Sequence, residues 1–159
     1  MPRVVGCDPG TSGLDLVLLE EGGLKDQARL TSVSGLVGSE VLIEQLRAWA
    51  PLDLIAGPSG YGLPLVTATE LSDEQLDLMT LVRPDERGRP LGLPSFRSWI
   101  TALRASEFPV VFLPGGIHLP SIPPHRKLNS IDLGTPDKIA VAALAIAWLG
   151  SIPDFRDHQ

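Results

Sequence analysis

Two stretches of the sequence share the pattern Asp-x-Gly-Thr, which places a carboxylate beside residues that favour tight turns. The first is VVGCDPGTSG, residues 4–13, and the second is SIDLGTPDK, residues 130–138. A carboxylate such as Asp8 can hold Mg²⁺ or its bound waters, and the metal can then bridge to phosphate oxygens. Successive backbone N–H groups in a turn can bind the anion itself. The first stretch therefore predicts a metal–phosphate site.

The residues after Asp8 fit the phosphate side of this site. Gly10 and Gly13 permit positive φ and let the backbone approach a ligand closely, and Thr11 and Ser12 add two hydroxyl groups. A hairpin without a ligand is the alternative interpretation, because Asp, Pro and Gly in this order favour a tight turn even where nothing is bound. In both cases we expect Asp8 at the end of the first strand, where the turn begins.

The second stretch predicts the start of a helix just after Gly134. Thr135 is a natural N-cap, and Pro136 suits the first helical position. Lys138 is unusual there, because a cation in the first turn faces the positive end of the helix dipole. A bound anion explains this lysine, and so does a solvated side chain that extends into water. Residues 139–149 are all apolar, so we expect the helix to be buried and its N-terminus to be fixed by packing.

A third stretch, GPSGYG at residues 57–62, follows a compact apolar run in the same manner. We expect Ser59 and Gly60 at the carboxyl end of a buried strand, where open α/β sheets bind their ligands. A tight turn that contains an ordinary Tyr61 is an equal alternative.

The elements that must position these residues follow from the hydrophobic patterning. Strands are expected at residues 3–7, 14–20, 24–33, 52–57 and 109–114, and helices at residues 40–50, 72–82, 95–106 and 136–149. Ser39 is the expected N-cap of the first helix, and Ser72 with Gln75 predicts a capping box at the start of the second. Short glycine-rich turns predict that the first three strands form an antiparallel meander. The order is β-β-β-α-β-α-β-α, with one further short helix in the middle of the chain. It predicts an α/β fold, namely a single ribonuclease-H-like domain with a mixed five-stranded sheet.

Composition limits the classes of partner. The chain has 159 residues, a formal net charge of −6 and a pI of about 4.9, so its overall field repels nucleic acids. Its longest apolar run, residues 139–149, is shorter than the roughly 20 residues that span a bilayer. The single cysteine, Cys7, excludes a disulfide within the chain and suits a reducing compartment. We therefore expect a soluble cytoplasmic protein with neither a nucleic-acid nor a membrane partner.

Three stretches together resemble a known family. GCDPGT, AGPSGYGLP and NSIDLGTPDKIAVAALAIA are similar, in this order, to an uncharacterised archaeal family related to acetate and butyrate kinases. VVGCDPGTSG followed by LDLVLLEEG also resembles the first phosphate motif of the wider sugar-kinase and actin-like ATPase superfamily. The resemblance implies that residues 1–150 form the first, ribonuclease-H-like domain of a kinase-like ATPase. Residues 151–159 would then be a tail or the start of a linker to a second domain.

The resemblance also implies Mg²⁺ and ATP as cofactors, with a small anionic or carboxylate substrate. Asp8 would organise Mg²⁺, and Asp132 would join it as a catalytic residue from the far wall of the cleft. The residues predicted to contact the cofactor, from the motifs and the resemblance together, are Gly10, Thr11, Ser12, Gly13, Ser59, Gly60, Gly134, Thr135 and Lys138.

Enzymes of this superfamily contain two such domains, and the second supplies another phosphate motif and the adenosine pocket. IDLGT at residues 131–135 does not match that second motif, because it leads into Pro136 and a helix rather than into a hairpin. The sequence therefore predicts the phosphate- and Mg-nucleotide-binding half of an acetate/butyrate-kinase-like phosphotransferase. We expect this half to be inactive alone and to need a second domain or a homodimer partner.

Two other functions stay open. A non-catalytic ribonuclease-H-like domain can serve as a dimerisation or scaffold module. A Holliday-junction-resolvase-like nuclease also begins with a strand ending in Asp-Pro-Gly, but it needs several carboxylates around two metal ions. The fourth predicted strand ends without an acid, and Asp137 is the last helix's only one, which disfavours the nuclease. His118, His125 and Arg126 could reach an acidic substrate, or they could form ordinary solvated surface.

Overall fold

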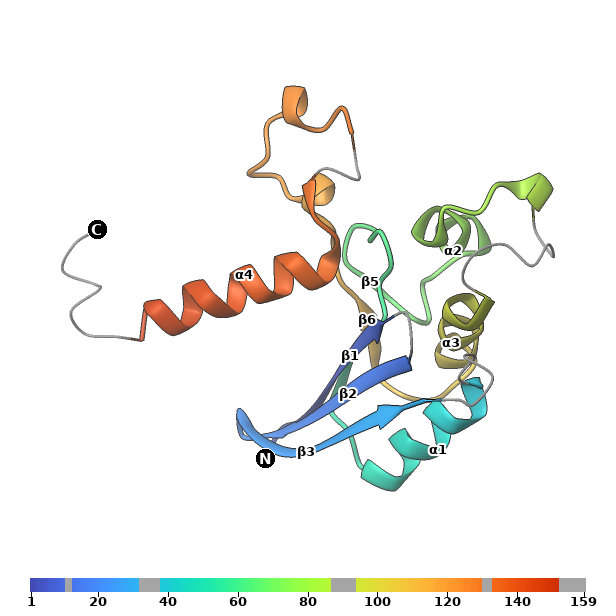
Figure 1. Cartoon of the computed structure of the whole chain (residues 1–159), viewed down its shortest axis with the longest axis vertical. Helices are drawn as coiled ribbons and strands as arrows, with labels where there is room; N and C mark the ends of the chain where they lie inside the picture. Colours follow the sequence, from blue (N-terminus) through green and yellow to red (C-terminus); the bar gives the residue numbers. More distant parts are fainter. Residues whose placement is uncertain (11–12, 32–37, 87–93, 130–132, 152–159) are drawn as a thin grey trace.

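The structure, a computed structural model, describes residues 1–10, 13–31, 38–86, 94–129 and 133–151. Within these residues the chain forms six strands and four α-helices (Figure 1). The strands are β1 (Arg3–Gly10), β2 (Gly13–Glu20), β3 (Gly23–Leu30), β4 (Leu54–Gly57), β5 (Val66–Thr67) and β6 (Val110–Phe112). The helices are α1 (Ser39–Trp49), α2 (Asp73–Thr80), α3 (Pro94–Arg104) and α4 (Pro136–Leu149).

The strands form one mixed sheet in the order β3-β2-β1-β4-β6-β5. Strands β1, β2 and β3 form the predicted antiparallel meander, whereas β1 pairs in parallel with β4, and β4 with β6. The carboxyl ends of β1, β4 and β6 therefore lie along one edge of the sheet. In open α/β sheets this is the edge at which ligands bind.

Two details of the sheet differ from the sequence prediction. The described chain has six strands rather than five, because β5 adds two residues antiparallel to β6. A strand of that length is too short to show a hydrophobic period. In addition, β1 does not end before Asp8 but continues to Gly10, because its pairing with β2 extends along the whole of both strands.

The predicted helix-capping signals are partly confirmed. Ser72 and Gln75 form the expected capping box at the start of α2: the Gln75 N–H donates to Ser72 Oγ at 3.2 Å, and the Ser72 N–H donates to Gln75 Oε1 at 2.8 Å. Helix α1 begins at Ser39 itself, with Gly38 in the N-cap position. The expectation that Ser39 caps this helix is therefore wrong.

Helices α1 and α3 cover one face of the sheet, and the core lies between them and the strands (Figure 1). Buried side chains from the strands are Val5, Leu14, Leu16, Leu18, Ile55, Val110 and Phe112. They meet Leu42, Leu46, Ile100 and Leu103 from the two helices. Burying a side chain of this size contributes about 1.5–3 kcal/mol, so this face fixes the positions of the strand ends.

The opposite face, which we call the open sheet face, is not covered by any described element. The cross-strand register places two rows of apolar residues on it, since paired residues point to the same side of a sheet. The rows are Val4, Leu19 and Leu54, and then Gly6, Val17, Ala56 and Val111. None of these residues is buried, and Leu54 is 38% exposed. The open sheet face is thus apolar and accessible to water.

Helix α4 has the predicted bounds but not the predicted burial. Its large side chains Val141, Leu144, Ile146 and Trp148 are between 63% and 71% exposed. Figure 1 shows α4 projecting away from the sheet, on the other side from α1 and α3. Only Pro136 of this helix is buried, so the expectation of a buried helix is wrong. An apolar sequence predicts that a helix needs a partner, but it does not say which surface provides one.

Candidate functional site

Asp8 is exposed and lies on the same side of the sheet as the open sheet face, near the carboxyl end of β1. It is paired in register with Asp15 of β2. Side chains directly opposite each other on neighbouring antiparallel strands have Cβ atoms about 4.5–5.5 Å apart. Two carboxylates therefore face each other near the end of the β1–β2 hairpin, whereas the sequence predicts a role for Asp8 alone.

Arg29 of β3 partly compensates this pair of negative charges. It is the register partner of Asp15, and its Nε lies 3.7 Å from Asp15 Oδ1. The Asp15 side chain is still 46% exposed, so both carboxylates are accessible to a cation from solvent. Like charges directly opposite each other destabilise a strand pair, and a bound divalent cation would remove this repulsion.

Gly10 and Gly13 do not adopt the positive φ that was expected of them, and their predicted contacts with phosphate stay predictions. Both glycines lie in extended strands and pair with each other. Gly13 has a packing reason to be glycine, because a Cβ there would lie 2.4 Å from the Leu30 carbonyl oxygen. Thr11 and Ser12 lie outside the described residues, so their predicted phosphate contacts stay predictions.

The second motif leads directly into α4. Gly134 has φ of 83°, and its carbonyl accepts a hydrogen bond from the Gly116 N–H at 3.0 Å, which anchors the start of the helix. Thr135 occupies the N-cap position as predicted, but its hydroxyl donates to the Asp137 carboxylate instead of capping the helix backbone. Lys138 Nζ donates to Asp137 Oδ2 at 2.5 Å. The three side chains form one polar cluster on the first turn.

Charges in this cluster alter two pKa values. Partial burial acts to raise the pKa of Asp137, but hydrogen bonds from Lys138 and Thr135 outweigh it and hold the pKa below its usual value. The hydrogen bond and charge of Asp137 raise the pKa of Lys138, with a further contribution from the charge of Asp8.

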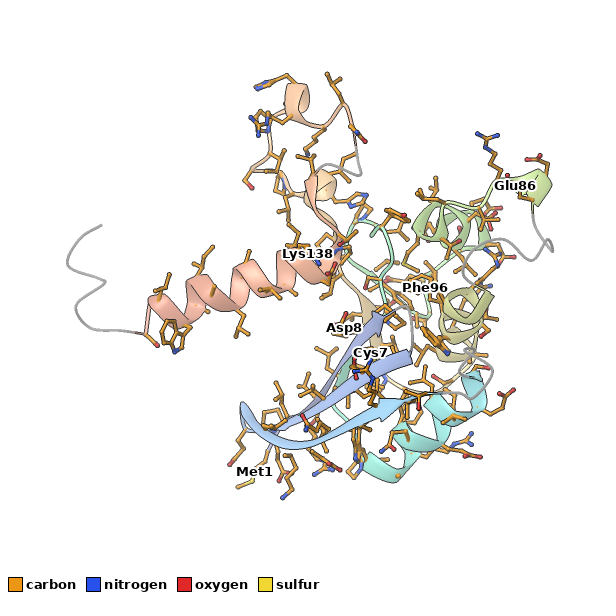
Figure 2. The ribbon with its side chains drawn as sticks, in the orientation of Figure 1. Met1, Cys7, Asp8, Glu86, Phe96 and Lys138 are labelled. Atoms are coloured by element: carbon orange, nitrogen blue, oxygen red, sulfur yellow. The ribbon has the colours of Figure 1, made fainter. Side chains whose placement is uncertain are left out.

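The first turn of α4 therefore lies within electrostatic reach of the β1 end, and Figure 2 shows Asp8 and Lys138 near each other. The structure thus brings Asp8, from the first stretch, and Lys138, from the second, to the same edge of the sheet. Asp132 lies outside the described residues, and its catalytic role stays a prediction.

Ser59 and Gly60 follow β4, but their interactions are with the protein itself. The Ser59 hydroxyl is buried; it donates to the Gly57 carbonyl at 2.8 Å and accepts from the Leu113 N–H at 2.8 Å. A Cβ on Gly60, which has φ of 55°, would lie 2.4 Å from the Met79 carbonyl oxygen. These contacts account for both residue types without a ligand, and a cofactor contact stays a prediction.

The histidines of the long loop differ in environment. Nδ1 of His118 is buried without a hydrogen-bond partner in the described structure. Burial lowers the pKa of His118 and outweighs an opposing interaction with the Gly115 backbone, and the charge of Lys127 lowers the pKa further. His125 and Arg126 are exposed in a short 3₁₀ turn, Pro124–Arg126.

A cavity of about 400 Å³ lies between α2 and α3, away from the Asp8 edge. Its lining includes Arg97 and Arg104, whose charges are compensated. Arg97 Nη1 lies 2.7 Å from Asp77 Oδ1, and Arg104 Nη1 lies 2.5 Å from Asp73 Oδ1. These ion pairs stabilise the contact between the two helices, and the cavity offers no unpaired charge from its arginines.

The chemistry of the donor set fits magnesium better than a transition metal. Within the described residues, no group of three His, Cys, Asp or Glu side chains is placed to hold a metal ion. Magnesium needs fewer protein ligands, because it usually keeps several waters and binds one or two carboxylates together with substrate phosphates. Asp8 and Asp15 would supply those carboxylates.

Comparison with known proteins places the chain in a family. The model of a family described as "Protein of unknown function (DUF1464)" matches residues 6–158, nearly the whole chain. The chain belongs to the DUF1464 family. A search of the curated proteins finds no match.

In the part of the chain that the structure describes, no helix has both the length and the apolar character needed to cross a bilayer.

Proposed function

We propose that this DUF1464 chain is the phosphate- and Mg-nucleotide-binding half of an acetate/butyrate-kinase-like phosphotransferase with a ribonuclease-H-like fold. The observation that carries the proposal is the position of Asp8. It is exposed at the carboxyl end of β1, opposite Asp15 and within electrostatic reach of Lys138 on the first turn of α4. The strand order, a meander followed by parallel strands, supports the fold assignment.

The charges at this edge suit a magnesium-bound phosphate. A carboxylate pair alone would repel phosphate, but Mg²⁺ bound at Asp8 and Asp15 neutralises this repulsion and can coordinate phosphate oxygens. Lys138 and the N–H groups at the start of α4 would then face the anion from the other side. Asp8, Asp15 and Lys138 would each meet a ligand charge of opposite sign, while Asp137 stays hydrogen-bonded to Lys138 and Thr135.

The described edge provides one wall of such a site. Asp8, Asp15 and Lys138 are all accessible to solvent, whereas efficient phosphoryl transfer needs a site that excludes water and stabilises the transferring group. We therefore propose that a second domain or subunit closes the site over a small anionic or carboxylate substrate. Alone, the chain would bind Mg-nucleotide and be inactive as a phosphotransferase.

Thermal shift with Mg²⁺ and ATP, and separately with Mg²⁺ and pyrophosphate, tests this function. We expect wild-type protein to be stabilised only when metal and anion are both present, and Asp8→Asn to lose most of this stabilisation. The matched control is Asp85→Asn, because Asp85 is an exposed aspartate on the short helix Pro84–Glu86, far from β1. Equal stabilisation of wild type and Asp8→Asn, or none in wild type, would refute the proposed site.

The exposed apolar surface of α4 favours a second candidate function, a non-catalytic dimerisation module. This function predicts a stable dimer together with no magnesium-dependent anion binding. The two candidates are therefore separated by the same thermal-shift measurement.

A further inference from the structure

The described chain has two apolar surfaces without a partner. One is the open sheet face, and the other is helix α4, whose residues 139–149 contain no charged or polar side chain. Helix α4 is accessible along its length except at its two ends, with Leu144 and Ile146 at 70% and 71% exposure. Contiguous exposed apolar surfaces, such as these two, mark interaction sites in proteins.

We propose that α4 of one copy packs on the open sheet face of a second copy, and that the second copy returns its own α4. The dimer would have two-fold symmetry with two identical helix-on-sheet contacts. This interface goes beyond the proposed function and does not depend on it.

The dimensions of the two surfaces match. Helix α4 has 14 residues, which corresponds to a length of about 21 Å. Strands β1 and β2 have eight residues each, which corresponds to about 26 Å. The apolar rows cross β2, β1, β4 and β6, four strands whose outer axes lie about 14 Å apart. A helix about 10 Å wide that lies along the strands therefore crosses both rows and covers their central part.

The polar ends of the two surfaces match as well. The charged residues of α4, Asp137 and Lys138, are both in its first turn and form an ion pair with each other. On the sheet, the row next to Gly6 and Val17 carries Asp8 and Asp15. A helix that places its first turn at this end keeps its charged residues at the charged end of the sheet and lays residues 139–149 over the apolar rows.

Two observations favour a second copy over a fold-back of the chain's own helix. First, α4 is apolar on all sides, so a single sheet would cover only one side of it. In a two-fold arrangement whose axis passes between the two α4 helices, the helices also lie beside each other, which covers a second side. Second, α4 projects from an anchored start at Gly134 and Pro136, away from its own sheet (Figure 1).

The area is sufficient for a stable dimer. The helical period places Val141, Leu144 and Trp148 on one side of α4 and Ile146 on the other. The three side chains that one sheet can cover offer on the order of 100 Å² of apolar surface each, or about 300 Å² for one helix. The exchange buries two helices and two sheet faces, so four such surfaces give about 1,200 Å², the lower limit of a standard stable interface.

Sedimentation equilibrium of the full chain over a wide dilution series tests the proposal. We expect a mass of twice 17.0 kDa for wild type. Leu144→Glu on α4 and Val17→Lys on the open sheet face should each raise the dimer dissociation constant by about 100-fold or more. The control Leu78→Glu changes a 63% exposed leucine of α2, outside both surfaces, and should keep the dimer.

Cross-linking distinguishes exchange from fold-back. One chain carries Val17→Cys and another carries Leu144→Cys, and the native Cys7 lies on the covered face of the sheet. We expect a bifunctional maleimide to join the two different chains when they are mixed. A monomeric wild type, a dimer that survives both Leu144→Glu and Val17→Lys, or cross-linking of a doubly substituted chain only within itself would overturn the proposal.

Discussion

Asp8 of β1 lies directly opposite Asp15 of β2, and both carboxylates lie on the side of the sheet that no described helix covers. Such a pair costs stability, because like charges face each other across the strands. The cost is understandable if the pair binds a cation. The relationship connects the stability of the β1–β2 ribbon to the proposed magnesium site.

The first prediction follows from this repulsion. Asp8→Asn should stabilise the metal-free protein by about 0.2–1 kcal/mol, because it removes one of two facing charges. Urea unfolding at low ionic strength in the presence of a chelator measures the change. High salt should reduce the gain, since it screens exposed charges. A clear loss of stability in Asp8→Asn would show that Asp8 has a structural role instead.

The second prediction concerns the glycines that flank the end of the ribbon. Gly13→Ala should destabilise the fold by about 1–3 kcal/mol, because the new Cβ would lie 2.4 Å from the Leu30 carbonyl oxygen. Gly10→Ala is the matched control, since its Cβ would make only an ordinary 3.6 Å contact. Chemical unfolding measures the free energy of unfolding of both variants. Equal losses of stability in Gly13→Ala and Gly10→Ala would contradict the packing explanation.

The third prediction concerns the single thiol. Burial against the core raises the pKa of Cys7 to about 12, so almost no thiolate is present near neutral pH. A thiol reagent such as Ellman's reagent should leave Cys7 unmodified in the native protein and react rapidly with it in denaturant. Rapid modification of the native chain would contradict this environment.

The fourth prediction concerns pH. Burial, with help from the charge of Lys127, lowers the pKa of His118 in the folded chain, whereas the unfolded chain binds a proton with a pKa of about 6.5. The unfolded state therefore binds more protons between these two values, and stability falls as the pH drops through about 6.5 towards the lower folded pKa.

Urea midpoints measured between about pH 8 and about pH 5, on both sides of the unfolded pKa, test this expectation. His118→Gln should reduce the fall of the urea midpoint at acid pH. The control His125→Gln should leave this fall unchanged, because His125 is exposed. An identical pH profile in His118→Gln and wild type would disprove the assignment.

Local patterns in the sequence predicted the elements well. The meander, the capping box of α2 and the bounds of α4 are all confirmed. Each depends on residues close in sequence, such as the pair Ser72 and Gln75, or on an apolar run bounded by turn residues. These signals are independent of what packs against the element.

Tertiary relationships were harder to predict. Asp15 was missed because the first turn was expected to begin at Asp8; a two-residue connection at positions 11 and 12 would have placed Asp8 and Asp15 opposite each other. The sequence explains Gly13 by a close approach to a ligand, whereas the structure adds a packing reason that depends on β3, because a Cβ at this position would lie 2.4 Å from the Leu30 carbonyl oxygen. The exposure of α4 depends on which surface covers it, and its sequence carries no such information.

The central claim is that a magnesium-bound anion occupies the edge formed by Asp8, Asp15 and the first turn of α4. Amide NMR spectra recorded with Mn²⁺ as a paramagnetic substitute for Mg²⁺, together with ATP, locate that site directly. We predict selective broadening at Asp8, Asp15 and Lys138, and none at Glu86, which lies on a distant helix (Figure 2). Broadening centred elsewhere, or unchanged signals at Asp8, would contradict the claim.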